Sequence, residues 1–162
     1  MRNYSQSWLN LSLTSLAIAG TLIAVNPVRM SAAPSPEIAR VAQAGNVGGP
    51  LATQLQGKPT VAYIYASWCP ACRNIAPTLS QLRQEYAGQV NFVVLDVSDR
   101  ATSRQAEATS RQLGLGRFFD DNKSQTGLVA IIDPATGNVL TQHRNNADRN
   151  AYASVLNAAL SR

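Results

Sequence analysis

The chain is poor in charged residues, and its basic residues form no cluster. Only 14% of the 162 residues are Asp, Glu, Lys or Arg. Lysines and arginines are scattered without runs or interleaved aromatic residues, and part of the net charge of +5 comes from Arg2, Arg29 and Arg40 near the amino terminus. This pattern argues against a nucleic-acid-binding surface. With 45% apolar residues the chain can still bury an ordinary core, which argues against disorder.

Cysteine and histidine are also scarce, with two cysteines and one histidine in the whole chain. A disulfide between Cys69 and Cys72 would close a very short loop and remove little entropy from the unfolded chain, so a purely structural bridge is a poor explanation. A mononuclear zinc site needs about four ligands, and the two thiols and His143 do not supply them. We therefore expect no metal and no cofactor, and we interpret His143 as a surface residue at a strand end without a catalytic role.

The amino-terminal segment has the composition of an export leader. Arg2 is the only charged residue before Arg29, and Trp8–Val25 between them is mostly apolar or small. As a helix these residues span about 27 Å, just short of a hydrocarbon core of about 30 Å. Small-residue cleavage sites follow at Ser31–Ala33 and Ala42–Ala44. Cleavage and retention as an anchor through residues 8–25 both remain open, and in both the domain lies outside the cytoplasm.

The next residues have linker composition. Residues 31–50 are small residues with Pro34, Pro36, Pro50 and several glycines, and a short helix over Glu37–Gln43 is the one regular element expected there. We therefore divide the chain into a signal peptide or signal anchor (1–30), a linker (31–50) and one folded domain (51–162).

The folded part alternates strands and helices. Thr60–Ala66 is a nearly continuous apolar run, typical of a strand buried on both faces, and Val90–Val97 predicts a second buried strand. A helix opens at Pro70, is kinked by Pro77 and ends at Gly88. Further elements are expected as follows: a helix from Ser98 or Asp99 to about Leu113, stopped by Gly114 and Gly116; a hairpin of Leu128–Ile132 and Val139–Gln142; and a last helix capped by Asp148. This order predicts a three-layer α/β/α sandwich.

The position of the cysteine pair predicts thiol–disulfide chemistry. Cys69 comes directly before a helix and Cys72 lies one turn inside it. The unpaired N–H groups and dipole at a helix start favour a thiolate, so Cys69 is the expected nucleophile. Cys72 then attacks Cys69 in the mixed disulfide and releases the reduced partner, leaving the redox-active disulfide Cys69–Cys72. A Cys-x-x-Cys pair that follows a buried strand and opens a helix is a strong signal.

The segment Ala66–Pro77, with Trp68-Cys69-Pro70-Ala71-Cys72 and a proline five residues further on, resembles the active site of the thioredoxin superfamily. The resemblance extends from about Thr53 to Leu160. The motif with Arg73, and the Ile131-Ile132-Asp133 hairpin, also resemble the exported, often membrane-anchored thioredoxin-like proteins of the periplasm and the thylakoid lumen. It implies a thioredoxin fold with a mixed central sheet, a thioredoxin-like domain over residues 51–162, and Trp68, Pro70, Ala71 and Thr126 around the cysteines. Implied partners are protein dithiols or disulfides and a membrane or lumenal thiol that donates or accepts electrons.

Three positions depart from the pattern of that superfamily. Tyr63 stands where a buried acid usually lies, Val94 where its Lys partner lies, and Thr126 where a cis-proline lies. A cis peptide before Thr126 would cost about 3 kcal/mol, so we expect a trans peptide and an altered substrate groove. The chain between Cys72 and Thr126 is also longer than in a minimal thioredoxin, with the extra length around Asp99–Lys123.

Two alternatives to an oxidoreductase remain open at the level of sequence. Proteins of this fold that lack the proline can admit metal, and two chains could share an iron–sulfur cluster through four thiolates. Alternatively, the domain could be an interaction module whose two cysteines form a disulfide that takes no part in exchange. Visible absorbance tests the first alternative, and a redox potential with an exchange partner tests the second.

Overall fold

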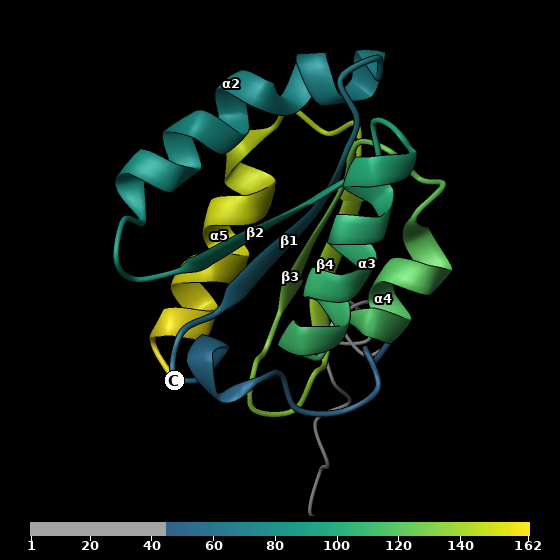
Figure 1. Cartoon of the computed structure of the whole chain (residues 1–162). Coiled ribbons are helices and arrows are strands. Elements are labelled where there is room, and N and C mark those ends of the chain that lie inside the picture. The colour runs from purple at the N-terminus through teal and green to yellow at the C-terminus, as the bar shows by residue number, and fades with distance from the viewer. Residues whose placement is uncertain (1–44) are drawn as a thin grey trace, which may run out of the picture. The chain divides into compact units, whose positions relative to one another are not determined.

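The sheet is built around two buried strands, β1 (Thr60–Tyr65) and β3 (Leu128–Ile132). The structure is a computed structural model that describes residues 45–162. β1 pairs in parallel with β2 (Asn91–Asp96) and antiparallel with β3, which pairs antiparallel with β4 (Val139–Arg144). The strand order is therefore β2-β1-β3-β4, and the sheet is mixed (Figure 1). The predicted strands β1 and β3 are confirmed, because their apolar runs lie between neighbours on both sides.

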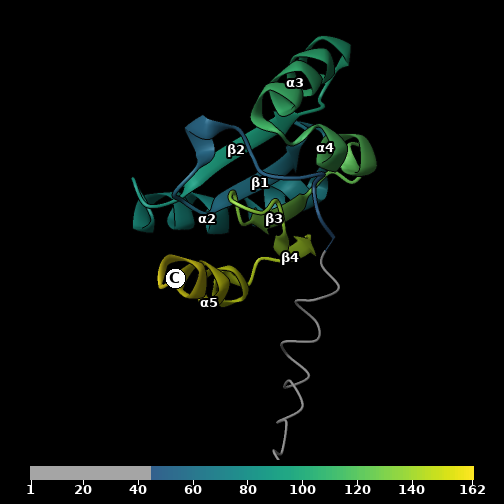
Figure 2. The same cartoon turned by 90° about the horizontal axis from the view of Figure 1, so that it is seen from below.

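Helices cover both faces of the sheet, which confirms the three-layer sandwich. Figure 2 shows α3 (Arg100–Leu113) and α4 (Gly116–Asn122) on one side, and α2 (Pro70–Glu85) and α5 (Arg149–Leu160) on the other. Strand side chains alternate between these layers. Ala62, Ile64 and Ala130 belong to the core under α3 and α4, whereas Val61, Tyr63 and Val129 belong to the core under α2 and α5.

The helix α2 begins and ends as expected. Pro70 occupies its first position, Pro77 lies inside it, and the positive φ of Gly88 follows its end. Its inner face carries Ile75, Leu79 and Leu82, which are buried against the sheet. This packing holds the amino-terminal end of α2, and with it the cysteine pair, against the end of β1.

The helix α3 is confirmed, with Asp99 as its cap. The Asp99 carboxylate accepts the N–H groups of Ala101 (2.7 Å) and Thr102 (2.9 Å), and the Thr102 hydroxyl closes a capping box. Gly114 ends the helix with φ 78° in the left-handed region.

The helix α4 is a correction to the sequence analysis, which treats Gly116 as a stop signal only. Gly116 instead begins a second, short helix, in which Phe118 and Phe119 are buried. The two aromatic residues are adjacent and show no helical repeat, so periodicity does not reveal this element. Their burial against the sheet stabilises the turn of helix, and the added length between α3 and β3 forms part of the layer next to Cys69.

The strand β2 is a second correction, because it lies at an edge of the sheet and is not buried on both faces. The side chain of Val94 is 40% exposed, while Val93 and Leu95 face the core. Edge strands have one free side, and an apolar run in the sequence does not distinguish an edge strand from a central one.

The hairpin and the last helix follow the prediction closely. β4 continues to Arg144, two residues beyond the predicted end. Asp148 caps α5 by accepting the N–H of Asn150 at 2.9 Å, and Tyr152 and Leu156 are buried beneath it. Leu160, the last residue of this helix, is 37% exposed.

The last residues of the predicted linker contact the hairpin. Asn46 forms an isolated β-bridge with Asn138, the Val47 N–H donates to the Gly137 carbonyl at 2.9 Å, and the Val47 side chain is 3% exposed. A short 3-10 turn, η1 (Thr53–Leu55), precedes β1. The domain boundary at residue 51 remains a prediction.

The predicted leader (1–30), the first part of the linker with the helix Glu37–Gln43, and both cleavage sites lie outside the described residues. Within residues 45–162, none of the helices combines the length and the apolarity needed to cross a bilayer.

Candidate active site

The loop after β1 holds Trp68 at the surface beside the cysteines. The Cys69 N–H donates to the Ala66 carbonyl at 3.1 Å, which closes a tight turn. Ser98, in the loop after β2, accepts the Ser67 N–H on its hydroxyl at 2.8 Å and the Trp68 indole N–H on its carbonyl at 2.9 Å. The Trp68 side chain is 60% exposed, so these bonds hold a large apolar ring in solvent next to the cysteines.

Cys69 is the N-cap of α2, in the position that the sequence predicts for the nucleophile. Its Sγ accepts the backbone N–H of Cys72 at 3.1 Å. Burial of the thiol opposes ionisation, but hydrogen bonds from the Cys72 side chain, the Thr126 hydroxyl and the backbone N–H groups of Cys72 and Ala71 outweigh it. The pKa of Cys69 therefore lies below its ordinary value.

Cys72 lies one turn inside α2 and faces β1. Its thiol lies 3.9 Å from the Ile64 carbonyl oxygen, and the residue is 1% exposed. Burial is the largest cause that raises the pKa of Cys72, followed by the hydrogen bond that it gives to Cys69, while the Tyr63 hydroxyl acts in the opposite direction. The net effect is a raised pKa, so Cys72 keeps its proton while Cys69 is a thiolate.

Thr126 lies next to Cys69, as the sequence predicts for the residue in the place of the proline. It is buried, and its hydroxyl is hydrogen-bonded to the Cys69 sulfur. Arg144 of β4 donates from Nε to the Thr126 carbonyl at 3.3 Å. The loop before β3 therefore supplies a side-chain donor to the thiolate. Whether the preceding peptide is trans stays a prediction.

Gly127 is a site residue that the sequence analysis missed. Its φ is 84°, and a Cβ added there would lie 2.6 Å from the Cβ of Ala71. Its N–H donates to the Ile64 carbonyl at 2.9 Å. Glycine is therefore required both by the backbone conformation and by the close approach of the loop to α2. The signal available in the sequence was a glycine directly after the proline-equivalent position.

Tyr63 and Val94 are paired in the parallel register of β1 and β2, which agrees with the positions assigned to the missing acid and its Lys partner. Tyr63 belongs to the same buried cluster as Cys69 and Cys72. Burial, followed by the neighbouring Cys72, raises the pKa of Tyr63, so the phenol stays protonated.

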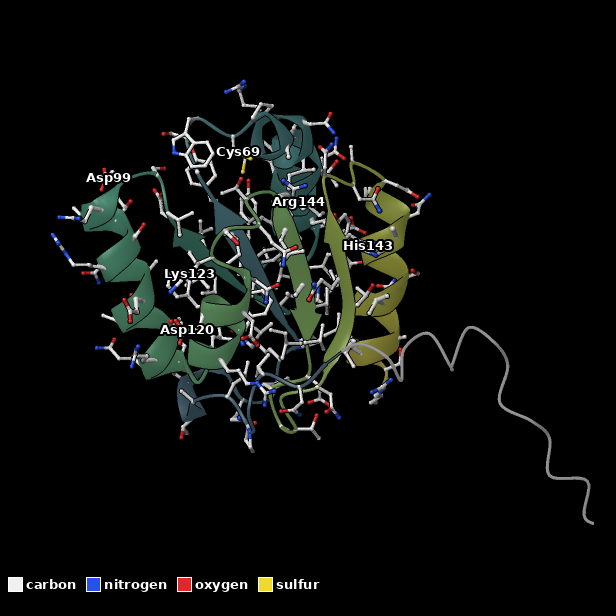
Figure 3. The ribbon with its side chains drawn as sticks, turned by 90° about the vertical axis from the view of Figure 1, so that its right-hand side faces the viewer. Cys69, Asp99, Asp120, Lys123, His143 and Arg144 are labelled. Atoms are coloured by element: carbon white, nitrogen blue, oxygen red, sulfur yellow. The ribbon has the colours of Figure 1, made fainter. Side chains whose placement is uncertain are left out.

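A cleft of about 530 Å³ opens beside Cys69, between the Trp68 loop, α3 and α4. Thr126 and Trp68 line its end near the cysteine, and its remaining walls are these residues: Val97, Arg100, Ser103, Arg104, Glu107, Phe119, Lys123 and Ser124. Figure 3 shows Cys69 at one end of the sheet, with Asp99 and Lys123 on the α3 and α4 side.

The sequence-predicted site residues thus come together, and His143 differs from its prediction. Pro70 is exposed in the first turn of α2, and Ala71 faces Gly127. His143 is half-buried and not a free surface residue, because its ring packs edge-on against Tyr152 of α5 at 5.3 Å and Nε2 lies 3.0 Å from the Thr141 hydroxyl. Among residues 45–162, no three His, Cys, Asp or Glu side chains gather as a metal site.

Comparison with known proteins gives one consistent answer. The family model described as Thioredoxin matches residues 51–112, which include β1, α2, β2 and both cysteines. The chain is therefore similar to the thioredoxin family over these residues. The similarity covers the strand, the Cys-x-x-Cys pair and the helix as one unit.

The superfamily relatives match around this unit. A thiol:disulfide interchange protein TxlA homolog of Synechocystis sp. is 47% identical over 51 residues, or 31% of this chain and 28% of the relative. The chloroplastic thioredoxin-like protein HCF164 of Arabidopsis thaliana is 49% identical over 43 residues, or 26% and 16%. The chain therefore spans less than a third of the length of these relatives. A solved structure of a putative thiol:disulfide interchange protein DsbE from Chlorobium tepidum aligns at 23% identity over 72% of this chain and 96% of that one, with a TM-score of 0.49.

Proposed function

We propose that this chain is a thiol–disulfide oxidoreductase that acts outside the cytoplasm on protein dithiols or disulfides. The observation that carries the proposal is the Cys69 sulfur at the helix start, 3.1 Å from the Cys72 N–H, with its pKa lowered while that of Cys72 is raised. Unequal thiols of this kind suit a two-step exchange, because one thiol attacks while the other stays protonated.

In the reducing direction, the Cys69 thiolate attacks one sulfur of a partner disulfide. A bond forms between Cys69 and that sulfur, the partner S–S bond breaks, and the second partner sulfur leaves with the electron pair as a thiolate. Cys72 then loses its proton and attacks Cys69, which releases the first partner sulfur and leaves the Cys69–Cys72 disulfide. Two electrons pass from the domain to the partner, and the reverse sequence oxidises a dithiol.

The cleft between Trp68 and α4 supports a protein partner. It ends at Thr126, beside the Cys69 sulfur, so a chain lying in it brings its own cysteine to the nucleophile. Because Thr126 replaces the proline of the superfamily and Tyr63 replaces the buried acid, we expect slow reduction of a generic disulfide such as insulin. Turnover as fast as that of an ordinary thioredoxin would contradict this expectation.

The direct test is capture of the partner with Cys72→Ser. This variant keeps the nucleophile Cys69 but cannot resolve the mixed disulfide, so partners should accumulate as disulfide-linked adducts that a reductant releases. The matched control is Cys69→Ser/Cys72→Ser, which should capture nothing. If both variants capture the same proteins, or neither captures any, the proposed exchange through Cys69 is wrong.

The proposed location rests on the composition of residues 8–25, and the chloroplastic relative agrees with it. Oxidising compartments turn an exposed dithiol into a disulfide, so a membrane or lumenal thiol donor is part of the proposal if the chain works as a reductant. A reporter that is active only outside the cytoplasm, fused after Arg162, should be active, and deletion of Trp8–Val25 should abolish its activity. An active reporter after that deletion would contradict export by this segment.

A further inference from the structure

The hydroxyl of Tyr63 is buried and meets no hydrogen-bond partner among the described residues. The other two buried tyrosines differ in this respect. The Tyr86 hydroxyl donates to the Asn157 side-chain oxygen at 2.9 Å, and the Tyr152 hydroxyl donates to the Asn146 carbonyl at 2.8 Å. Since buried polar groups are almost always hydrogen-bonded, the unpaired hydroxyl of Tyr63 calls for an explanation.

Packing explains the ring of Tyr63 but not its oxygen. The ring lies edge-on to Tyr65, with centroids 5.8 Å apart, and forms part of the wall of a cleft of about 290 Å³ between α2 and β2, together with Leu79 and Val94. A phenylalanine would make the same contacts. Tyr63 and Cys72 belong to one buried cluster, and the Cys72 thiol lies 3.9 Å from the carbonyl oxygen of Ile64, the residue after Tyr63. Each of the two groups also acts on the pKa of the other.

We propose that the Tyr63 hydroxyl donates a hydrogen bond to the Cys72 thiolate as it forms during resolution of the mixed disulfide. This rests on the proposed function. The phenol is raised in pKa and stays protonated, so it can donate but not take up the thiol proton. The hydroxyl is unpaired in the resting protein because the Cys72 thiolate, to which it donates, exists only during the second step.

The step balances without another reactant. The Cys72 proton passes to water, the thiolate accepts the Tyr63 O–H, and its electron pair then forms the bond to Cys69 while the partner sulfur leaves as a thiolate. The oxygen retains its own proton throughout. Tyr63 thus stabilises the anion but does not carry the proton away.

Few other titratable or charged groups surround this pair. α2 contributes Cys69 and, at the 290 Å³ cleft, Arg83; β1 contributes Tyr65; and α5 contributes Tyr152, which is occupied with Asn146. β2 and β3 present apolar side chains here, Val94 and Val129. None of these groups is a carboxylate, so the pH dependence of resolution should report mainly on Cys72.

Tyr63→Phe tests the proposal in the full chain, with Ellman's reagent as the probe. The reagent forms a mixed disulfide on Cys69 and releases one coloured thiolate, and attack by Cys72 then releases the second. We expect an unchanged first phase, a second phase about tenfold slower near neutral pH, and a pH midpoint of that phase raised by about one unit. The matched control is Tyr65→Phe, which removes a hydroxyl from the ring packed edge-on against Tyr63 and should leave both phases unchanged.

The outcomes separate this proposal from the proposed function. If the second phase of Tyr63→Phe keeps the rate and pH midpoint of the unmodified protein, or if Tyr65→Phe slows it equally, the role of Tyr63 is overturned while the exchange reaction stands. If the unmodified protein shows no second phase, the proposed function itself fails. A folding defect in Tyr63→Phe would slow the first phase as well and would also count against a specific role.

Discussion

Cys69 and Cys72 are the same residue type three positions apart, yet their surroundings move their pKa values in opposite directions. Both are buried, at 2% and 1% exposure, and burial opposes the ionisation of both. Cys69 precedes the first turn of α2, whose N–H groups have no partner within the helix and point at its sulfur. Cys72 lies inside that turn, and its own N–H donates to the Cys69 sulfur.

The balance between burial and the donors aimed at each thiol sets the direction of its pKa shift. At Cys69 burial is outweighed by the Cys72 thiol, the Thr126 hydroxyl and the N–H groups of Cys72 and Ala71. At Cys72 burial and the adjacent Cys69 outweigh the lowering effect of the Tyr63 hydroxyl and the Ala66 N–H. Variants that add or remove a donor, or that move the loop carrying one, should therefore change one cysteine and spare the other.

The largest effect is expected from replacing each of the two cysteines in turn by serine. Cys69→Ser should lose the fast reaction with Ellman's reagent entirely, because the remaining thiol of Cys72 has a raised pKa and does not precede the helix. Cys72→Ser should keep the first phase and lose only the second. Stopped-flow absorbance distinguishes the phases, and a fast first phase in Cys69→Ser would reverse the assignment of nucleophile.

The next effect concerns the contact that holds Thr126 in place. Gly127→Ala combines a left-handed φ with a Cβ 2.6 Å from Ala71, so we expect the free energy of unfolding to fall by about 2 kcal/mol or more and the pKa of Cys69 to rise. Gly88→Ala is the matched control, because its φ is 74° but nothing lies within 4 Å of the added carbon. It should cost about 1 kcal/mol and leave Cys69 unchanged. Denaturant unfolding of both variants measures the difference, and equal losses would remove the role assigned to the contact.

A smaller effect should isolate the Thr126 hydroxyl. Thr126→Val keeps the shape of the side chain and removes the donor, so the pKa of Cys69 should rise by about one unit. Since only the thiolate reacts, the pH at which alkylation reaches half of its maximal rate should move up by the same amount, while the second phase keeps its pH midpoint.

The control for this variant is Thr78→Val. It removes a hydroxyl that donates to the Ala147 carbonyl at 2.8 Å, away from the cysteines. This change should lower the free energy of unfolding by about 1 kcal/mol without moving the pKa of Cys69. Alkylation profiles that shift equally in both variants would mean that Thr126 acts through stability alone.

The elements whose signals are local were predictable from the sequence. The start of α2 at the cysteines follows from the position of Pro70 after a buried strand. The strand β3 has the predicted bounds, Leu128–Ile132. Asp99 and Asp148 cap their helices as expected, because capping depends on residues within one turn. The element α4 and the edge position of β2 were missed, since both depend on which surfaces the rest of the chain covers.

The sequence by itself predicts the nature of the chemistry and Cys69 as the nucleophile, because a cysteine directly before a helix obtains its donors from its own next residues. Only the tertiary structure decided how the two thiols are separated in pKa. Thr126 acts on Cys69 from the loop before β3, and Tyr63 acts on Cys72 from β1, on the same side of the sheet as α2. The approach of Thr126 to Cys69 joins residues far apart in the chain, and it arises only when the sheet register and the close approach of Gly127 to Ala71 bring them together.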